Sequence, residues 1–357
     1  MKHKFNYNWT LKDAVFTKDK GKVFSCFACG GGSTMGYKLA GFDVIGHNDI
    51  DKKMIEVYKE NHNPKFSFLE SITTFAKRKD LPRELYELDI LDGSPPCSSF
   101  SMAGNREKDW GKEKVFREGQ AEQVLDTLFF DFIDLAKELQ PKVVVAENVA
   151  GLMMGNAKEY VKKIYIAFKE AGYELRIEPY LLDASTMGVP QKRRRVFFIA
   201  IRTDLSEKFM EQIDMFQIAP RLVLEFNEPK ISFSEIFKDY TDRPLSENMK
   251  AIWDLRKKGD ISFETINERE KGKKFLHFGH KFIYMNGTIN TILGNDQCCL
   301  FDYPRYRNFN ELCSSGSYPL DYNFNGNKSD YLIGMSVPPV MTAQIASNIY
   351  DQWLSKI

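Results

Sequence analysis

The sequence predicts a doubly wound α/β domain accompanied by a second, smaller domain. Between residues 22 and 204, short apolar runs alternate with longer stretches whose apolar residues recur at helical spacing. Several of the short runs are apolar almost throughout, which is typical of parallel strands covered by helices on both faces. After residue 204 the alternation stops, and mixed short segments with a charged stretch continue to about residue 300.

These patterns place the individual elements. Strands are expected over residues 23–29, 42–49, 88–93, 143–149, 175–184 and 196–201. Helices are expected over residues 51–60, 124–139, 158–171 and 338–354, the last with proline in its first turn. A sheet of this kind binds its ligands outside the carboxyl ends of its strands.

Composition and cysteine usage narrow the class of protein. The 50 Lys and Arg residues balance 49 Asp and Glu residues, so net charge neither indicates nor excludes a nucleic-acid partner. Six cysteines in a chain of 357 residues with a polar N-terminus favour reduced thiols and a cytoplasmic protein without a membrane anchor. The pairs Cys26/Cys29 and His277/His280 each lack the second pair of a zinc site, so no metal is expected.

A glycine-rich turn, CGGGSTMG (29–36), follows the first expected strand, and such a turn lets the backbone approach a ligand closely. Its spacing differs from the dinucleotide-binding GxGxxG and from the triphosphate-binding loop. The next strand ends at Asp49, which is placed to hydrogen-bond a ribose, whereas Asp51 suits the N-cap of the following helix. These features indicate an adenosine-containing cofactor.

The stretch GSPPCSSFS (93–101) places Cys97 behind two prolines at the end of an expected strand. The prolines fix φ and stiffen the approach, so the thiol projects from a rigid arm, as a nucleophile requires. In an isolated PPC, the pattern favours a cysteine that is simply a small apolar residue in a loop. The groups that accompany Cys97 decide between these interpretations.

Two more polar groups fall at the ends of expected strands. VVVAENV ends with Glu147 and Asn148, where a carboxyl group can give or accept a proton, although a helix cap or a surface acid has the same pattern. In GVPQKRRRVFFIAI, strand alternation would point Arg193 and Arg195 to one side and Arg194 to the other. Two guanidinium groups on one side suit a phosphate or a base edge, and the alternative is a basic surface turn.

In chain order, FACGGG, NDID, GSPPCSSFS, ENV, QKRRR and GMSVPPVM resemble the motifs of the DNA (cytosine-5) methyltransferases. The resemblance covers roughly residues 22–204 and 305–357. Cys29 stands where the family usually has glycine, Ser98 where it has glutamine, and Met335 where it has asparagine. None of these departures removes a group that the family's chemistry requires.

The resemblance implies a Rossmann-like, S-adenosylmethionine-dependent methyltransferase fold. A catalytic domain is expected over 1–204, a target-recognition domain over 205–304, and a C-terminal segment over 305–357 that completes the catalytic domain. The implied partner is double-stranded DNA, and a cognate restriction endonuclease is possible for enzymes of this modification type. A monomer associated with a prokaryotic nucleoid is the expected state.

The resemblance also implies roles for single residues. Cys97 would add to carbon 6 of the target cytosine, and Glu147 would hold the N3 and 4-amino edge of the ring. Arg195 would bind the O2 side, and Arg193 would support Glu147 or a phosphate. The residues expected to bind the cofactor are Phe27, Gly30, Gly31, Gly32, Asp49, Ile50, Ile72, Pro96, Leu128, Ser336 and Val337. Those expected to contact DNA are Ser98, Ser101, Gln191 and Arg305.

Two segments are candidates for handling DNA. Residues 98–120 are long, polar and rich in Lys, Arg and Gly, and we expect them to form a mobile lid. The basic run Lys257–Lys281 is a candidate contact to the DNA backbone, although a solvated helix face would have the same charge pattern.

Three rival functions remain open. A tRNA cytosine-5 methyltransferase shares the PPC and ENV motifs, and a DNA-binding regulator without catalysis would keep the fold. A nicotinamide oxidoreductase is disfavoured because the GxGxxG spacing is absent. The target DNA sequence cannot be derived from one chain, because base contacts follow no code that the sequence alone exposes.

Overall fold

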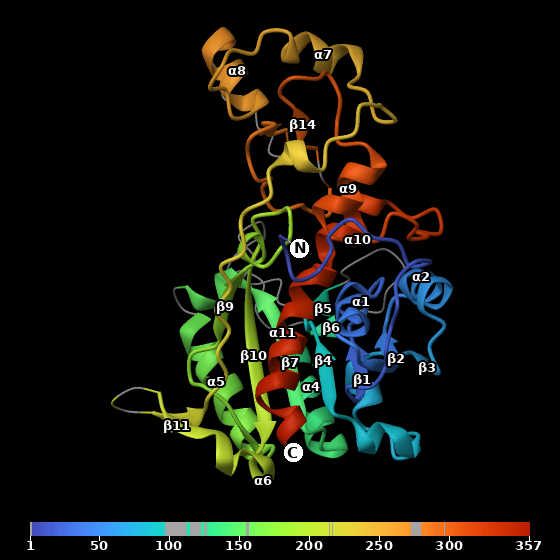
Figure 1. Ribbon diagram of the computed structural model, residues 1–357, viewed down its shortest axis with the longest axis vertical. Helices are drawn as coiled ribbons and strands as arrows, with labels where there is room; N and C mark the ends of the chain where they lie inside the picture. Colours follow the sequence, from blue (N-terminus) through green and yellow to red (C-terminus); the bar gives the residue numbers. More distant parts are fainter. Residues whose placement is uncertain are drawn as a thin grey trace. The chain divides into compact units, whose positions relative to one another are not determined.

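The computed structural model describes residues 2–96, 113–114, 123–124, 127–154, 157–213, 215, 217–272, 280–295 and 297–357. The chain forms two compact units (Figure 1). Unit 1 comprises Met1–Ala14, Ala184–Arg193 and Asn227–Met341. Unit 2 comprises Val15–Asp183, Arg194–Phe226 and Thr342–Ile357.

Unit 2 is built on a twisted sheet with the strand order β3-β2-β1-β4-β7-β10-β8, and β9 pairs with β10. The strands are β1 (Lys22–Cys26), β2 (Asp43–Asp49), β3 (Phe66–Leu69), β4 (Ile90–Gly93), β7 (Val143–Val149), β8 (Tyr173–Glu174), β9 (Tyr180–Asp183) and β10 (Arg194–Arg202). Strands β3, β2, β1, β4 and β7 are mutually parallel, whereas β10 is antiparallel to its neighbours.

The winding of the sheet reverses between β1 and β4. The chain first adds β2 and β3 on one side of β1 and then places β4 on the other side. In doubly wound sheets, ligands bind at the carboxyl ends of the two strands that flank such a reversal. The fold therefore points to the ends of β1 and β4 as a binding site.

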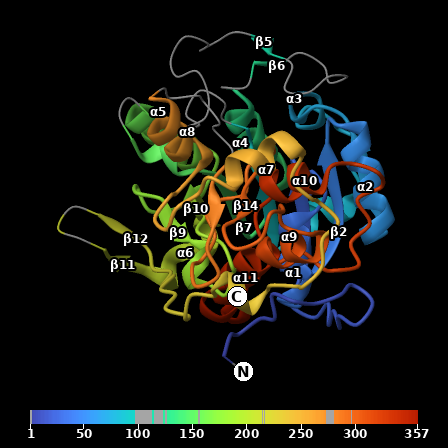
Figure 2. The same cartoon turned by 90° about the horizontal axis from the view of Figure 1, so that it is seen from above.

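Helices cover both faces of this sheet. Seen from above, α1 and α11 lie on one side and α3, α4 and α5 on the other (Figure 2). The helices of this unit are α1 (Gly32–Leu39), α2 (Lys52–His62), α3 (Ile72–Phe75), α4 (Leu128–Leu139), α5 (Ala157–Glu170), α6 (Thr203–Ser206) and most of α11 (Pro339–Gln352). Two short hairpins, β5 (Glu113–Lys114) with β6 (Gln123–Val124) and β11 (Met210–Gln212) with β12 (Ile218–Pro220), complete the list.

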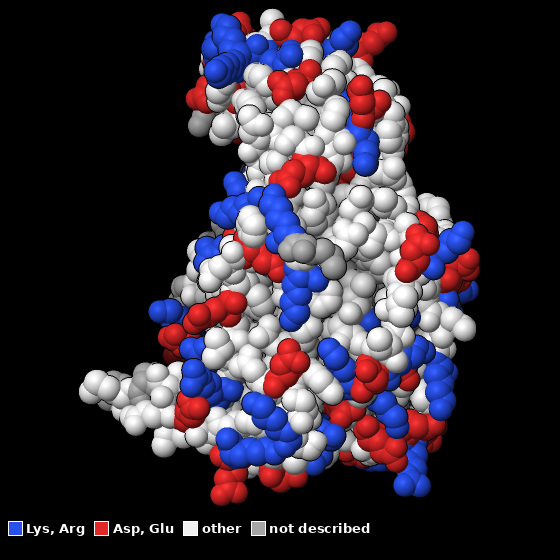
Figure 3. All heavy atoms as spheres, viewed as in Figure 1, with Lys and Arg blue, Asp and Glu red and all other residues white. Residues whose placement is uncertain are grey.

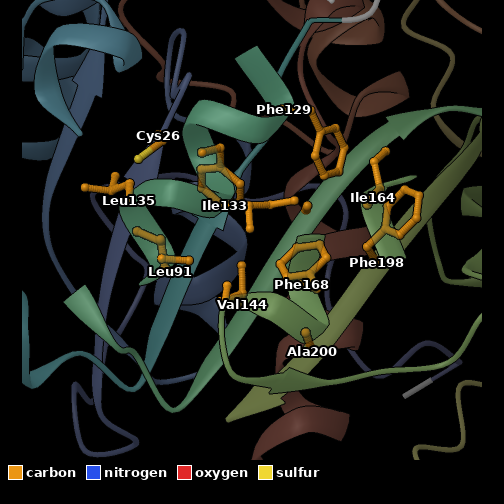
Figure 4. Close-up of a cluster of buried hydrophobic side chains, with 14 of the residues drawn as sticks. Cys26, Leu91, Phe129, Ile133, Leu135, Val144, Ile164, Phe168, Phe198 and Ala200 are labelled. Carbon is orange, nitrogen blue, oxygen red and sulfur yellow. The ribbon is translucent and has the colours of Figure 1, made fainter. Parts of the chain in front are cut away.

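The main core lies between the sheet and helices α4 and α5 (Figure 4). Phe129 of α4 meets Phe198 of β10 edge to face, with ring centroids 5.3 Å apart. Ile164 and Phe168 of α5 are fully buried in the same cluster. Because burial of one such side chain contributes roughly 1.5–3 kcal/mol, this apolar face fixes how the helices dock on the sheet.

Unit 1 has its own small core, in which Trp253, Phe263 and Phe282 pack together. The N-terminal segment belongs to this unit, since the Trp9 Nε1 donates to the Ser317 carbonyl oxygen at 2.9 Å. The elements of unit 1 are α7 (Glu247–Trp253), α8 (Phe263–Lys271), α9 (Phe309–Ser315), α10 (Ser329–Met335), β13 (Phe282–Ile283) and β14 (Cys299–Leu300).

The sequence-based elements are confirmed in most places. Strands β1, β2, β4, β7 and β10 and helices α2, α4, α5 and α11 occur where they were expected. Strand β3 was missed because its four residues are too short to show a period, and of the run 175–184 only β9 is a strand. The parallel arrangement that the alternation predicted holds for β3, β2, β1, β4 and β7, whereas β10 returns antiparallel to β7.

The compact units divide the chain at residues other than those expected for the domains, since residues 1–14, 184–193 and 305–341 all belong to unit 1. Assignment of target recognition to residues 205–304 stays a prediction. Within the described parts of the chain, no helix is long and apolar enough to span a bilayer.

Candidate active site at the carboxyl edge of the sheet

The glycine-rich turn between β1 and α1 has an unusual backbone. Phe27 and Cys29 both have positive φ values, 52° and 47°, which are uncommon for residues other than glycine. Gly31 follows with φ 85° as the N-cap of α1, and a Cβ built on it would lie 2.3 Å from Nε2 of His62. Left-handed non-glycine residues are costly and concentrate at functional sites, so this turn is a candidate ligand cradle.

The two aspartates after β2 have separate environments, as the sequence predicts. Asp51 caps α2, because its carboxylate accepts hydrogen bonds from the backbone N–H groups of Lys53 and Met54. The Asp49 carboxylate instead accepts from the backbone N–H of Cys29 at 2.7 Å and of Asp51 at 2.8 Å. Burial raises the pKa of Asp49 to about 6, while these backbone hydrogen bonds oppose the shift. The cap role of Asp51 is confirmed, and a ribose contact by Asp49 stays a prediction.

A second buried carboxylate lies at the end of β4. The Asp92 Oδ2 accepts hydrogen bonds from Ser25 Oγ at 2.8 Å and Ser33 Oγ at 2.7 Å. The Asp92 Oδ1 accepts one from the Tyr37 hydroxyl at 3.1 Å. Asp92 pairs with Ser25 across the β1–β4 ladder, so its carboxylate ties together the two strands at the reversal of the sheet.

Glu147 and Arg195 form the ion pair of the site. Arg195 Nε lies 2.9 Å from Glu147 Oε1, and both side chains are about one-tenth exposed. The two residues sit diagonally across the antiparallel β7–β10 pair, since Arg195 faces Val149 and Phe197 faces Glu147. Burial lowers the pKa of the Arg195 guanidinium, and the Glu147 charge opposes that shift. The two side chains that the sequence predicted to act together are therefore in contact.

Asn148 links β7 to the turn that leads into Cys97. Its Nδ2 donates to the Pro95 carbonyl oxygen at 3.2 Å, and the residue is buried. Cys97 itself, with Ser98 and Ser101, lies outside the described residues, as does most of the expected lid. The described part of the turn thus ends one residue short of Cys97, and Asn148, the neighbour of Glu147, anchors it.

Arg193 and Gln191 belong to unit 1 and make their contacts there. The Arg193 guanidinium is buried and donates to the carbonyl oxygens of Ile292 and Gly334. Strand β10 begins at Arg194, so the expected alternation of three arginines along one strand is wrong for Arg193. Support of Glu147 by Arg193 stays a prediction.

The Gln191 side chain is fully buried and bridges two segments of unit 1. Its Nε2 donates to the Ser315 carbonyl oxygen at 3.2 Å, and its Oε1 accepts from the Ile292 N–H at 3.0 Å. The expected DNA contact of Gln191 finds no support in this geometry, because the amide is used inside the protein.

Arg305 is likewise an internal residue. It is 5% exposed and makes two hydrogen bonds to the Glu311 carboxylate, at 2.7 Å and 2.8 Å. The same guanidinium donates to the carbonyl oxygens of Tyr306 and Lys238. The expected DNA contact of Arg305 finds no support in this geometry, because the guanidinium is engaged with a buried carboxylate.

The remaining residues expected to bind the cofactor divide between the units. Ile72 and Leu128 are buried in the main core, and Phe27 packs partly buried against it. Ile50 and Pro96 are partly buried, and Gly30 and Gly32 flank Gly31 in the turn. Ser336 and Val337 lie in unit 1 directly after α10, where the Ser336 hydroxyl accepts from Tyr318 at 2.6 Å and donates to the Leu332 carbonyl oxygen.

Sequence reasoning missed two residues of the site. Asp92 gave no signal because its partners, Ser25, Ser33 and Tyr37, are more than 50 positions away along the chain. Asn148 was visible in the ENV motif, but its bond to Pro95 depends on the β4–β7 pairing. Among the residues that the structure describes, no three His, Cys, Asp or Glu side chains gather as metal ligands would.

Comparison with known families now decides the classification. The family model described as C-5 cytosine-specific DNA methylase matches residues 21–351 of the chain. The chain belongs to this family. Its fold is accordingly the Rossmann-like fold of S-adenosylmethionine-dependent methyltransferases.

Individual relatives agree with this assignment. Type II methyltransferase M.FnuDI of Fusobacterium nucleatum is 36% identical over 185 residues, which are 52% of this chain and 48% of the relative. Orphan methyltransferase M.SPRI of Bacillus phage SPR is 35% identical over 266 residues, 70% of this chain and 56% of the relative. The matched segments thus span about half the length of these curated relatives.

A solved structure of similar fold is a mutant of Spodoptera frugiperda DNMT2. It aligns with a TM-score of 0.60 at 17% identity, covering 92% of this chain and 99% of the other. At this identity the likeness establishes the fold only.

The residues at the carboxyl edge fit an adenosyl cofactor with a positive charge. The left-handed turn is tied to Asp49 through the backbone N–H of Cys29, and Asp49 presents its carboxylate at the end of β2. Asp92 adds a buried carboxylate whose partners among the described residues are neutral hydroxyls. S-adenosylmethionine carries a nucleoside that would suit the glycine-rich turn and Asp49. It also carries positive charge that would suit Asp92.

Proposed function

We propose that this protein methylates carbon 5 of cytosine in double-stranded DNA, with S-adenosylmethionine as methyl donor. The observation that carries the proposal is the Glu147–Arg195 ion pair, which lies beside the Asn148-anchored turn leading into Cys97. An acid and a guanidinium next to a thiol are the groups that covalent activation of a pyrimidine requires.

The chain's own residues account for activation of the base. Carbon 5 of cytosine is a weak nucleophile, and the Cys97 thiolate overcomes this by forming a bond from Sγ to carbon 6. Glu147 gives a proton to N3 as the ring electrons shift, and Arg195 stabilises the charge that develops at O2. S-adenosylmethionine, when bound, supplies the methyl group on a positively charged sulfur. Loss of the carbon 5 proton, departure of Sγ and return of the N3 proton to Glu147 would then restore the ring, the thiolate and the acid.

The cofactor would be held by the turn and by the ends of the parallel strands. Asp49 would accept hydrogen bonds from the ribose hydroxyls, and Phe27 would lie against the adenine. Gly31 would let the backbone approach without a clash. The target cytosine must leave the duplex to reach Cys97, as in other enzymes that modify bases.

Unit 1 would contact the DNA. Basic side chains gather at the end of unit 1 that holds α8, interleaved with acidic ones (Figure 3). Part of the basic run is internally neutralised, since Arg269 pairs with Asp260 and Glu270. A cavity of about 460 Å³ in the same unit is lined by the exposed Lys192 and Lys281, which are candidates for phosphate contacts.

Transfer of a labelled methyl group tests the proposal. The purified protein is incubated with labelled S-adenosylmethionine and either unmethylated duplex DNA or bulk tRNA, and the nucleic acid is digested to nucleosides. The proposed function predicts labelled 5-methyldeoxycytidine from duplex DNA, abolished by Cys97→Ser. Label confined to tRNA would instead establish the RNA activity, and label at the 4-amino group would contradict the carbon 5 chemistry.

A further inference from the structure

Among the residues that the structure describes, the buried Asp92 carboxylate has no positively charged hydrogen-bond partner. It is 4% exposed, and its hydrogen-bond partners among the described residues are the hydroxyls of Ser25, Ser33 and Tyr37. A buried carboxylate is normally paired with a cation, because neutral donors compensate only part of the lost hydration. The position therefore suits a charge that arrives with a ligand.

The place of Asp92 in the fold identifies that ligand. Asp92 on β4 pairs with Ser25 on β1, the two strands between which the sheet reverses its winding. Ser33, its second partner, lies in the first turn of α1, directly after the glycine-rich turn. Ligands of doubly wound sheets bind above these two strand ends, so a cation near Asp92 belongs to the cofactor.

The charge state of Asp92 is compatible with this role. Burial raises the pKa of Asp92 to about 6, the hydroxyl hydrogen bonds from Ser33, Ser25 and Tyr37 lower it, and the Glu147 charge raises it. At neutral pH the group is therefore ionised while it is still costly to keep charged. A bound cation would lower the free energy of the buried carboxylate, and this gain would contribute to the affinity for the cation.

We propose that Asp92 is the counter-charge that selects the cationic end of the methyl-donating cofactor. This inference rests on the proposed function and deepens it, because it assigns the charge preference of the cofactor site to one residue. S-adenosylmethionine has two positive groups, the sulfonium and the α-ammonium. Asp92 acts on one or both through the field of its carboxylate.

Three ligands separate the possibilities. S-adenosylmethionine has both positive groups, S-adenosylhomocysteine has only the ammonium, and 5′-methylthioadenosine has neither. Dissociation constants for all three are measured by calorimetry at about pH 7.5 with wild type and Asp92→Asn. The proposal predicts that Asp92→Asn lowers the affinity for S-adenosylmethionine by a factor at least about tenfold larger than the factor for methylthioadenosine. If Asp92 recognises the ammonium, S-adenosylhomocysteine should lose as much affinity as S-adenosylmethionine. If Asp92 recognises the sulfonium, S-adenosylhomocysteine should lose as little affinity as methylthioadenosine.

Asp89→Asn is the matched control variant. Asp89 precedes β4, at the opposite end from Asp92, and accepts from the backbone N–H of Lys22 and from the ammonium of Lys142. This variant also removes one carboxylate, directly before the same strand and at the amino edge of the sheet. It is expected to leave the preference among the three ligands unchanged, within about twofold.

A pH series on the wild type keeps the test valid if Asp92→Asn does not fold. Among the residues that the structure describes, the titratable groups that act on Asp92 are Cys26 on β1, Tyr37 on α1, Tyr58 on α2 and Glu147 on β7. Burial raises the pKa of Cys26, Tyr37 and Tyr58, so none of these three gains or loses charge in acid. The preference for S-adenosylmethionine over methylthioadenosine should therefore fall as the pH drops through about 6.

The outcomes separate the two proposals. If Asp92→Asn lowers the affinity for all three ligands equally, or for none of them, the role of Asp92 is overturned. The proposed function would still stand in that case. A wild-type protein that binds none of the three ligands would contradict the cofactor of the proposed function itself. A preference that does not change with pH would also contradict the counter-charge.

Discussion

At the scale of single residues, the carboxyl edge of unit 2 combines buried charges that are costly alone. Glu147 has Arg195 as partner, whereas Asp49 and Asp92 are held by neutral donors. Such groups are typical of functional sites, because their charge is held ready for a substrate or cofactor. The sequence exposed Glu147 and Arg195 through their motifs, but it could not expose Asp92, whose environment exists only after β1, β4 and α1 pack.

Replacement of Arg195 tests the ion pair. Arg195→Met should lower the rate of methyl transfer at least about 100-fold, because it removes the charge that stabilises O2 and leaves Glu147 buried without its partner. Affinity for S-adenosylmethionine should stay within about threefold of the wild type. Single-turnover rates and cofactor binding give both values, with the exposed neighbour Arg194→Met as control. A rate near that of the wild type would remove Arg195 from the mechanism.

The stability of the free protein should depend on pH through Asp92. Burial raises its pKa in the folded state to about 6, above the ordinary value of 3.8, so the folded state holds the proton more tightly. The contribution of Asp92 to stability is therefore present below about pH 4 and is lost as the pH rises through 6. The free energy of unfolding is measured with urea at about pH 4.5 and about pH 7. The decrease between these two pH values should be smaller in Asp92→Asn than in the wild type, by on the order of 2 kcal/mol. Identical decreases would place the Asp92 pKa near its ordinary value.

At the scale of elements, helices α2, α4, α5 and α11 follow from sequence because their apolar residues recur at helical spacing. The direction of β10 does not follow, since strand hydrophobicity is the same in parallel and antiparallel pairs when both faces are buried. The cap of α2 was predictable because Asp is a strong N-cap residue and the helical pattern begins right after it.

The two aspartates after β2 should respond differently to substitution. Asp51→Ala removes the N-cap of α2 and should lower the free energy of unfolding by about 1 kcal/mol. Asp49→Asn should instead lower the affinity for S-adenosylmethionine about tenfold, because it replaces the carboxylate proposed to bind the ribose. Denaturant unfolding and calorimetric binding on both variants test the assignment. A cofactor defect in Asp51→Ala larger than that in Asp49→Asn would reverse it.

The turn between β1 and α1 can be tested with two glycines. Gly31 and Gly172 have similar positive φ values, 85° and 91°. A Cβ on Gly31 meets His62 at 2.3 Å, whereas a Cβ on Gly172 meets no atom within 4 Å. Gly172→Ala should cost about 1 kcal/mol from backbone strain, and Gly31→Ala should cost at least about 2 kcal/mol more from the clash. Equal melting temperatures for the two variants would show that the turn relaxes freely.

At the scale of the whole molecule, the order of motifs along the chain identified the family, whereas the division into units could not be foreseen. Residues 1–14 join unit 1 through contacts such as Trp9 to Ser317, more than 300 positions away. The family resemblance implied a DNA contact for Arg305, but its partners Glu311 and Lys238 make it part of the interior of unit 1. A charged side chain is assigned correctly only when its partner is known.

The Arg305–Glu311 pair should therefore act on stability and not on DNA binding directly. Arg305→Ala leaves the fully buried Glu311 without its counter-charge and should destabilise unit 1 by about 3–5 kcal/mol. In variants that remain folded at low temperature, the salt dependence of DNA binding should keep the wild-type slope, because no phosphate contact is lost. A stable variant with a slope reduced by about one unit would restore Arg305 as a phosphate contact.

The most direct test of the central claim is bisulfite sequencing of plasmid DNA from a methylation-free host that expresses this protein, beside the Cys97→Ser variant. We predict protected cytosines at one short recurring sequence in the wild-type sample and complete conversion in the variant. Complete conversion in both samples, with the wild-type protein folded and able to bind S-adenosylmethionine, would contradict DNA cytosine methylation by this chain.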